Sequence, residues 1–136
     1  MSISDKIQSI KKELPNNVTL VAVSKTKSEE EILQAYNSGH KIFGENKVQE
    51  AKIKWTSIKK EKSRLNLHFV GKLQTNKVKD VVKLFDYVHS LENIKQAEAL
   101  SRYELKLKKK LKYFIQINIG YETQKSGIAP QDLKSF

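Results

Sequence analysis

A lysine directly after an apolar run is the residue best placed to do chemistry. Val21, Val23 and Lys25 alternate along a predicted strand, so their side chains share one face. If the two valines point inward, Lys25 stands at the rim of the fold, partly removed from water. Desolvation favours the neutral amine, which can attack an aldehyde to form a Schiff base. The alternative is that Lys25 follows a strand by chance, because the chain has 26 lysines and arginines.

Two amides further along form the second candidate. In the predicted strand 113–119, Ile115, Ile117 and Ile119 occupy one face, and Gln116 and Asn118 occupy the other. We expect the isoleucines to pack under flanking helices and the amides to point inward, where buried polar groups need partners. A bound polar ligand and an internal amide network are the two alternatives.

The histidines give a weaker indication. His68 lies within a predicted strand, without a second histidine or a carboxylate at metal-ligand spacing, and His40 and His89 are scattered. We therefore interpret His68 as a core residue and predict no metal site. The sequence also has no phosphate-binding glycine loop, dinucleotide fingerprint or nucleophile elbow.

Strands and helices, which alternate along the chain and differ in the spacing of their apolar residues, must position these candidate residues. Short apolar runs predict strands at 18–23, which should be buried, and at 41–43, 65–70, 87–91 and 113–119. An amphipathic helix ended by Pro15 opens the chain. Further helices are predicted to begin at the Ser28–Glu31 capping box, at Asn46, at Thr75 or Asn76, at an Asn93–Gln96 box and at Pro130.

Strands alternating with helices imply a parallel sheet with right-handed crossovers. Both an open doubly wound sheet and a (β/α) barrel satisfy this pattern. Polar clusters follow most of the strands, as in the Ser24-Lys25 and Glu45-Asn46 pairs. They favour a barrel, whose active site lies at the carboxyl ends of its strands, although helix capping explains several of them. We predict an α/β fold of the parallel TIM-barrel type, incomplete at about five of eight βα units, as a single domain over 1–136.

Composition narrows the classes of function. The chain of 136 residues is 38% hydrophobic and 30% charged, as in ordinary globular domains. It lacks cysteine, a secretory signal and an apolar membrane-spanning stretch, so we expect a cytoplasmic protein without membrane partners. The net charge of +11 could indicate nucleic-acid binding. Because no aromatic stacking pattern accompanies the charge, we favour a solvated surface and expect no specific nucleic acid.

Four motifs in order carry a resemblance that covers nearly the whole chain. They are Val21-Ala-Val-Ser-Lys25, Phe43-Gly-Glu-Asn-Lys-Val-Gln-Glu50, His68-Phe-Val-Gly-Lys-Leu-Gln-Thr-Asn-Lys77 and Asn118-Ile-Gly-Tyr-Glu-Thr-Gln-Lys-Ser-Gly127. Together they resemble the YggS/PROSC family of pyridoxal phosphate homeostasis proteins, which have the fold of the alanine racemase N-terminal domain. The resemblance implies pyridoxal 5′-phosphate (PLP) as cofactor, a role in vitamin B6 homeostasis and no established enzymatic activity.

The resemblance also assigns residues. Lys25 would hold PLP as a Schiff base, Asn46 would lie beside it, and Ser90 and Asn118 would line the same mouth. It adds His68, Gln74 and Asn76 as cofactor-binding or scaffold residues. In the family, the part beyond strand five supplies the phosphate cup and an arginine near the pyridine nitrogen. We therefore expect weakened or absent cofactor affinity for this chain alone.

Several alternatives remain at this point. The chain could be a non-functional fragment, a half-barrel that needs a second chain, a PLP-dependent amino-acid racemase or a nucleic-acid-binding module. Racemisation needs acid/base groups on both faces of the substrate carbon, and a second domain often supplies one of them. The expected partner is the small-molecule cofactor, and a completing chain and apo-enzyme recipients are left open.

Overall fold

A parallel sheet with its strands in sequential order forms the centre of the molecule. The computed structural model describes residues 2–120, 122–123 and 126–136; positions 121, 124 and 125 of the fourth motif lie outside the described residues. The order is β1-β2-β3-β4-β5, and every neighbouring pair is parallel. The strands are β1 Ala22–Val23, β2 Ile42–Glu45, β3 Asn66–Phe69, β4 Tyr87–Leu91 and β5 Lys112–Ile115. Five parallel strands in chain order, of which β1 to β4 are each followed by an α-helix, confirm the fold of a contiguous part of a barrel.

One α-helix precedes the first strand, and each of the others connects two strands. The helices are α1 Ile3–Glu13, α2 Glu29–Asn37, α3 Val48–Glu61, α4 Val78–Leu84 and α5 Ile94–Leu107, with 3₁₀ helices at Thr75–Lys77 and Pro130–Asp132. The Ser28–Glu31 capping box of α2 is confirmed. The Asn93 side chain caps α5 by accepting from the Gln96 N–H, but Gln96 Oε1 accepts from the Glu92 N–H and closes no reciprocal box.

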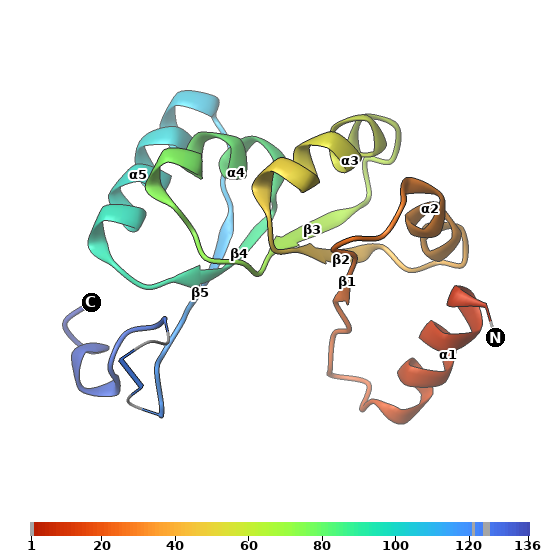
Figure 1. Cartoon of the computed structure of the whole chain (residues 1–136), viewed down its shortest axis with the longest axis horizontal. Helices are drawn as coiled ribbons and strands as arrows, with labels where there is room; N and C mark the ends of the chain where they lie inside the picture. The colour runs from red at the N-terminus through yellow and green to blue at the C-terminus, as the bar shows by residue number, and fades with distance from the viewer. Residues whose placement is uncertain (1, 121, 124–125) are drawn as a thin grey trace.

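One face of the sheet is covered by helices α3, α4 and α5, which Figure 1 shows on the same side of the strands. Phe43 of β2 lies 5.1 Å from Trp55 of α3, and Phe69 of β3 lies 5.1 Å from Phe85, measured between ring centroids. The apolar stripe predicted for α3, Val48, Ala51, Trp55 and Ile58, is buried in this core. We call this the outer face.

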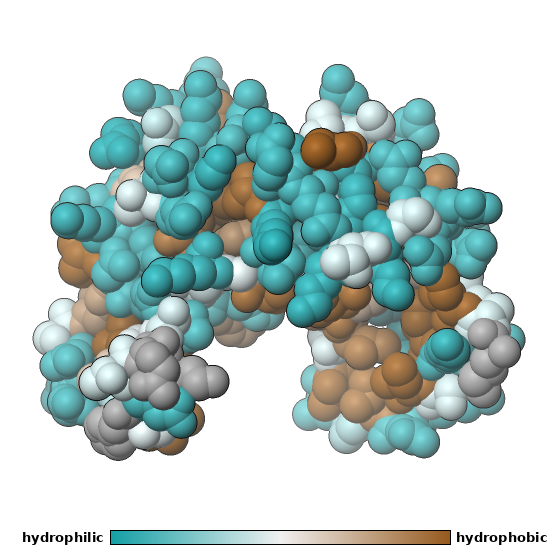
Figure 2. Space-filling view, in the orientation of Figure 1, coloured by the Kyte–Doolittle hydropathy of each residue, from teal (hydrophilic) through white to brown (hydrophobic). Residues whose placement is uncertain are grey.

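The opposite face, here called the inner face, is left largely open. The strand registers place Val23, Gly44, His68, Tyr87 and Lys112 side by side across all five strands. Val23 lies on this face beside Gly44, and it is 49% exposed. Figure 2 shows the molecule as an arch, hollowed beneath the sheet between the N-terminal and C-terminal segments.

The two outermost strands differ most from expectation. The strand predicted at 18–23 shrinks to Ala22–Val23 and is not buried, because it pairs with β2 alone and has no neighbour on its other side. The strand predicted at 113–119 ends at Ile115, and beyond it only an isolated bridge joins Ile117 to Ile128.

The isoleucines of that last segment do not form the predicted buried row. Ile115 is 42% and Ile119 is 78% exposed, because the fifth strand has no outer neighbour and the chain leaves the sheet after it. Pro130 begins a 3₁₀ helix of three residues rather than an α-helix.

Candidate functional site

Lys25 lies in the short turn that leaves the carboxyl end of β1. Val21 and Val23 share one face by the alternation of the strand, but β1 ends at Val23 and this alternation does not extend to Lys25 in the turn. The γ carbons of those two valines lie 3.1 and 3.5 Å from the point where a Cβ on Gly44 would stand, which confirms that they share its face. Lys25 itself is exposed, so the expected partial desolvation is wrong. The five strands leave the inner side open to water.

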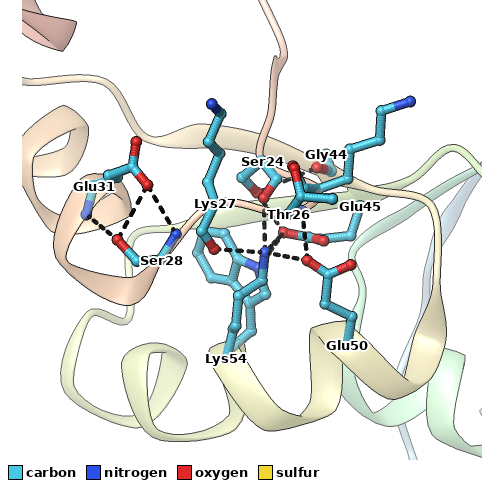
Figure 3. Close-up of polar contacts among 11 residues, drawn as sticks. Ser24, Thr26, Lys27, Ser28, Glu31, Gly44, Glu45, Glu50 and Lys54 are labelled. Atoms are coloured by element: carbon cyan, nitrogen blue, oxygen red, sulfur yellow. Dashed lines mark hydrogen bonds and ion pairs between the residues drawn. The ribbon is translucent and has the colours of Figure 1, made fainter.

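A buried lysine holds the turn that contains Lys25. Lys54 of α3 is 8% exposed, and its Nζ donates to the carbonyl oxygens of Ser24 at 2.7 Å and Lys27 at 3.1 Å. The same ammonium lies 2.9 Å from Glu45 Oε2 and 2.8 Å from Glu50 Oε2. Figure 3 shows Lys54 reaching up from its helix into the middle of this group. A buried ammonium is stable here because two carboxylates and two carbonyls surround it.

Glu45 links the turn to the core. Its Oε2 accepts hydrogen bonds from Ser24 Oγ at 2.5 Å and from the Trp55 indole N–H at 2.9 Å. The carboxylate is fully buried and comes from the end of β2. Three donors, one from the turn after β1 and two from α3, therefore converge on one oxygen at the end of β2, which fixes β1, β2 and α3 relative to one another.

Glu50 supports the turn from the exposed side. Its Oε2 accepts from Lys54 Nζ at 2.8 Å and from the Thr26 backbone N–H at 2.6 Å, and the Lys54 contact first, then the Thr26 contact, lowers the pKa of the Glu50 carboxyl below its ordinary value. Thr26 has a φ of 64°, in the left-handed region that a β-branched residue rarely adopts. The carboxylate stabilises this strained backbone.

Asn46 and Gln74 line the same shallow cavity of about 300 Å³ at the ends of β2 and β3, together with Lys47, Lys72 and Lys77. Asn46 does not cap α3 as predicted: the helix begins one residue later, and its N-terminal flanking residue Lys47 makes no side-chain cap. The Oδ1 atom of Asn46 is buried without a hydrogen-bond partner among the described residues.

The remaining predicted residues are spread along the sheet. Ser90 on β4 is buried, and its Oγ has no hydrogen-bond partner among the described residues. Asn118, beyond β5, donates from Nδ2 to the Glu122 carbonyl at 2.6 Å. Asn76 is exposed in the 3₁₀ helix before α4. Among the described residues, Asn46 and Gln74 thus share the cavity at the ends of β2 and β3 and Asn118 lines another, whereas Lys25 lines neither of these two cavities.

His68 has a partner that sequence spacing did not indicate. Its Nδ1 lies 2.7 Å from Nε2 of His89, which the sequence analysis treated as scattered, and its ring stacks on Tyr87 at 4.1 Å. Burial, reinforced by the nearby His89, lowers the pKa of His68 to about 4. Burial also lowers the pKa of His89. A neutral histidine pair therefore lies on the inner face, and Phe114 covers His89 at 4.7 Å.

The sequence did contain a signal for the missed residue Lys54. It stands three residues after Ala51 and four before Ile58, on the apolar stripe of α3, and four residues after Glu50. A lysine on a buried stripe needs charged partners, so this spacing predicts an internal ion pair. The spacing indicates Glu50 as a partner, but it does not indicate the more distant partners Ser24, Lys27 and Glu45.

Residues 2–120, 122–123 and 126–136 offer neither a metal-binding cluster nor a membrane-spanning helix. Those residues contain no group of three or more histidine and acidic side chains that could hold a metal ion. None of the helices that they form combines the length and the apolar character needed to cross a bilayer.

The comparisons with known proteins agree with this fold. A family model described as the alanine racemase N-terminal domain matches residues 1–136. Proteins named pyridoxal phosphate homeostasis protein are similar: the one from Pasteurella multocida is 45% identical over 116 residues, which cover 85% of this chain and 50% of the relative. The one from Haemophilus influenzae is 42% identical over 118 residues, 87% of this chain and 50% of the relative. The chain thus spans about half the length of these curated relatives.

Solved structures give the same result. PipY of Synechococcus elongatus without PLP matches with a TM-score of 0.93 and 36% identity, covering 98% of this chain and 62% of that chain. PipY with PLP bound matches with a TM-score of 0.89 and 35% identity, covering 98% and 61%. Alanine racemase from E. faecalis, 16% identical with a TM-score of 0.66 over 98% of this chain and 36% of that one, shares the fold. From the match over its whole length, the chain belongs to the alanine racemase N-terminal domain family.

Proposed function

We propose that this chain binds PLP at the carboxyl ends of its strands, holds it as a Schiff base on Lys25 and serves vitamin B6 homeostasis. One observation carries the proposal: Lys25 is an exposed lysine at the carboxyl end of β1, in a chain that matches a PLP-bound structure with a TM-score of 0.89. PLP supplies an aldehyde, which a neutral lysine amine can capture with loss of water.

The polar atoms of the described residues fit such a ligand. Asn46 Oδ1, next to the end of β2, and Ser90 Oγ, near the end of β4, are buried without partners among those residues. Buried polar groups in native proteins are nearly always hydrogen-bonded, so unpaired atoms at strand ends are candidates for ligand contacts. We propose Asn46 and Ser90 as contacts of the bound cofactor, and Gln74, Asn76, His68 and Asn118 as residues that support the surrounding strands.

A homeostasis role is favoured over catalysis. The curated relatives at 42–45% identity are named homeostasis proteins, whereas the alanine racemase that shares the fold is only 16% identical. An assay of amino-acid racemisation with the PLP-loaded chain separates the two functions. We expect no turnover above that of free PLP, and turnover that depends on Lys25 would establish the enzyme instead.

Affinity is expected to be modest for this chain alone. Barrels of this type bind phosphate with the loops after their last strands, and this chain spans about half of its curated relatives. We propose that Lys25 captures the aldehyde while a segment equivalent to the rest of those relatives, in the same or a second chain, strengthens binding.

Trapping tests the proposal directly. The purified chain is mixed with PLP and reduced with borohydride, and the modified residues are identified by peptide mass mapping. We expect the label to be concentrated on Lys25. Lys25→Arg keeps the charge but cannot form the Schiff base, so it should lose that label, while Lys27→Arg in the same turn should keep it. Equal labelling of many surface lysines in all three proteins would refute the assignment.

A further inference from the structure

The turn between β1 and α2 is held at three backbone positions that flank Lys25: Ser24 before it, and Thr26 and Lys27 after it. Lys54 Nζ binds the carbonyl oxygens of Ser24 and Lys27, and Glu50 binds the N–H of Thr26. The Lys25 carbonyl in turn accepts from Thr26 Oγ1 at 2.6 Å. The backbone on both sides of Lys25 is thus fixed, while its side chain is exposed and free of this network.

Lys54 is the only group that joins all parts of this arrangement among the residues shown in Figure 3. An ammonium has three N–H donors, and here four oxygen atoms from two carboxylates and two carbonyls lie within 3.1 Å of it. The charge of Lys54 therefore connects the buried Glu45, the partly exposed Glu50 and the turn. Without it, Glu45 and Glu50 would repel each other, and Ser24 and Lys27 would lose their donor.

We propose that Lys54 is a positioning residue: it fixes the left-handed turn at Thr26 and so directs the Lys25 side chain toward the inner face. This inference rests on the proposed function of Lys25 and adds a second lysine with a different task. Lys54 contributes no bond to the cofactor. It increases the fraction of time that the Lys25 amine spends in an orientation from which it can react with the aldehyde.

The test removes the charge of Lys54 without leaving a buried carboxylate unpaired. The double variant Lys54→Met/Glu45→Gln replaces both charges by neutral groups of similar size. Lys52→Met is the matched control, because Lys52 lies on the same helix, is 44% exposed in its side chain and pairs with Asp80 on the surface, at 3.4 Å. Circular dichroism first establishes that each variant is folded.

Two measurements follow on each folded variant. The first is the rate of borohydride-fixed labelling at Lys25 relative to other lysines, which a general loss of stability would not change selectively. We expect it to fall about tenfold or more in the double variant, because small displacements of a reacting group have effects of this size or larger. The second is hydrogen exchange of the Thr26 amide, which should become faster. Lys52→Met should change neither.

The outcomes separate the two hypotheses. If the folded double variant labels Lys25 at the original rate and Thr26 exchange is unchanged, the positioning role is overturned. If the unmodified chain does not label at Lys25, the proposed function fails, and Thr26 exchange alone then decides whether Lys54 holds the turn.

If the double variant does not fold, Glu50→Gln replaces it: Thr26 and Lys54 lose a charged acceptor there, and labelling at Lys25 should fall about threefold. Unchanged labelling and exchange in that variant would equally overturn the inference.

Discussion

The stability of this chain should depend on the protonation of His68. Its pKa is lowered from an ordinary 6.5 to about 4, first by burial and then by the charge of His89, while Asp86 acts in the opposite direction. Above pH 6.5 the residue is neutral in both states and has no effect. As the pH falls from 6.5 toward 4, the unfolded chain binds a proton that the folded chain does not, so stability is lost.

The size of the loss follows from that difference. At about 1.4 kcal/mol per pKa unit, the interval from 6.5 to about 4 corresponds to a maximum of about 3 kcal/mol, of which about 2.5 kcal/mol is lost by pH 4.5. His68→Phe keeps a flat ring against Tyr87 but cannot bind a proton. The variant should therefore lose about 2.5 kcal/mol less than the original chain between pH 7.5 and 4.5.

Urea unfolding at several pH values measures this directly. Trp55 is the only tryptophan of the chain and is fully buried, so its fluorescence reports unfolding. Tyr87→Phe is the matched control, because it alters the same stack without removing a group that titrates in this range. Acid protonation of carboxylates affects all three proteins alike and cancels in the comparison. Equal pH dependence in His68→Phe and the original chain would show that the reasoning is wrong.

Two further predictions concern packing. A Cβ on Gly71 would lie 1.9 Å from the Asn46 carbonyl oxygen, so Gly71→Ala should lower the free energy of unfolding in urea by about 2 kcal/mol or more. Gly120→Ala is the control: a Cβ there has its nearest neighbour at 3.7 Å, so the free energy of unfolding should change by less than about 0.5 kcal/mol. Trp55→Phe removes a hydrogen bond to the buried Glu45 and should cost about 2 kcal/mol or more, seen as a lower midpoint in thermal unfolding by circular dichroism. A midpoint equal to that of the original chain would contradict the importance of the indole N–H.

Local patterns of the sequence were sufficient for much of the fold. The order of strands and helices, the capping box at Ser28 and the buried stripe of α3 follow from neighbours within a few residues. The same holds for the shared face of Val21 and Val23, which needs only the alternation of a strand. These features agree between sequence and structure because short-range sterics and hydrogen bonds decide them.

The ends of the sheet could not be predicted in this way. Val18 and Ile119 belong to runs typical of buried strands, yet they are 48% and 78% exposed. Whether an apolar strand residue is buried depends on the elements that cover it, and β1 and β5 each have a neighbour on one side only. Sequence periodicity describes a face but does not say what packs against that face.

By itself, the sequence determined an alternating βα chain with a lysine at the end of its first strand. Only the tertiary structure decided which distant groups meet there. His68 reaches His89 because the registers of β3 and β4 align them, and Lys54 reaches Ser24 because α3 packs beneath the β1 turn. Such contacts depend on register and helix packing over 20 to 30 residues of chain, which the pattern of nearby residues does not specify.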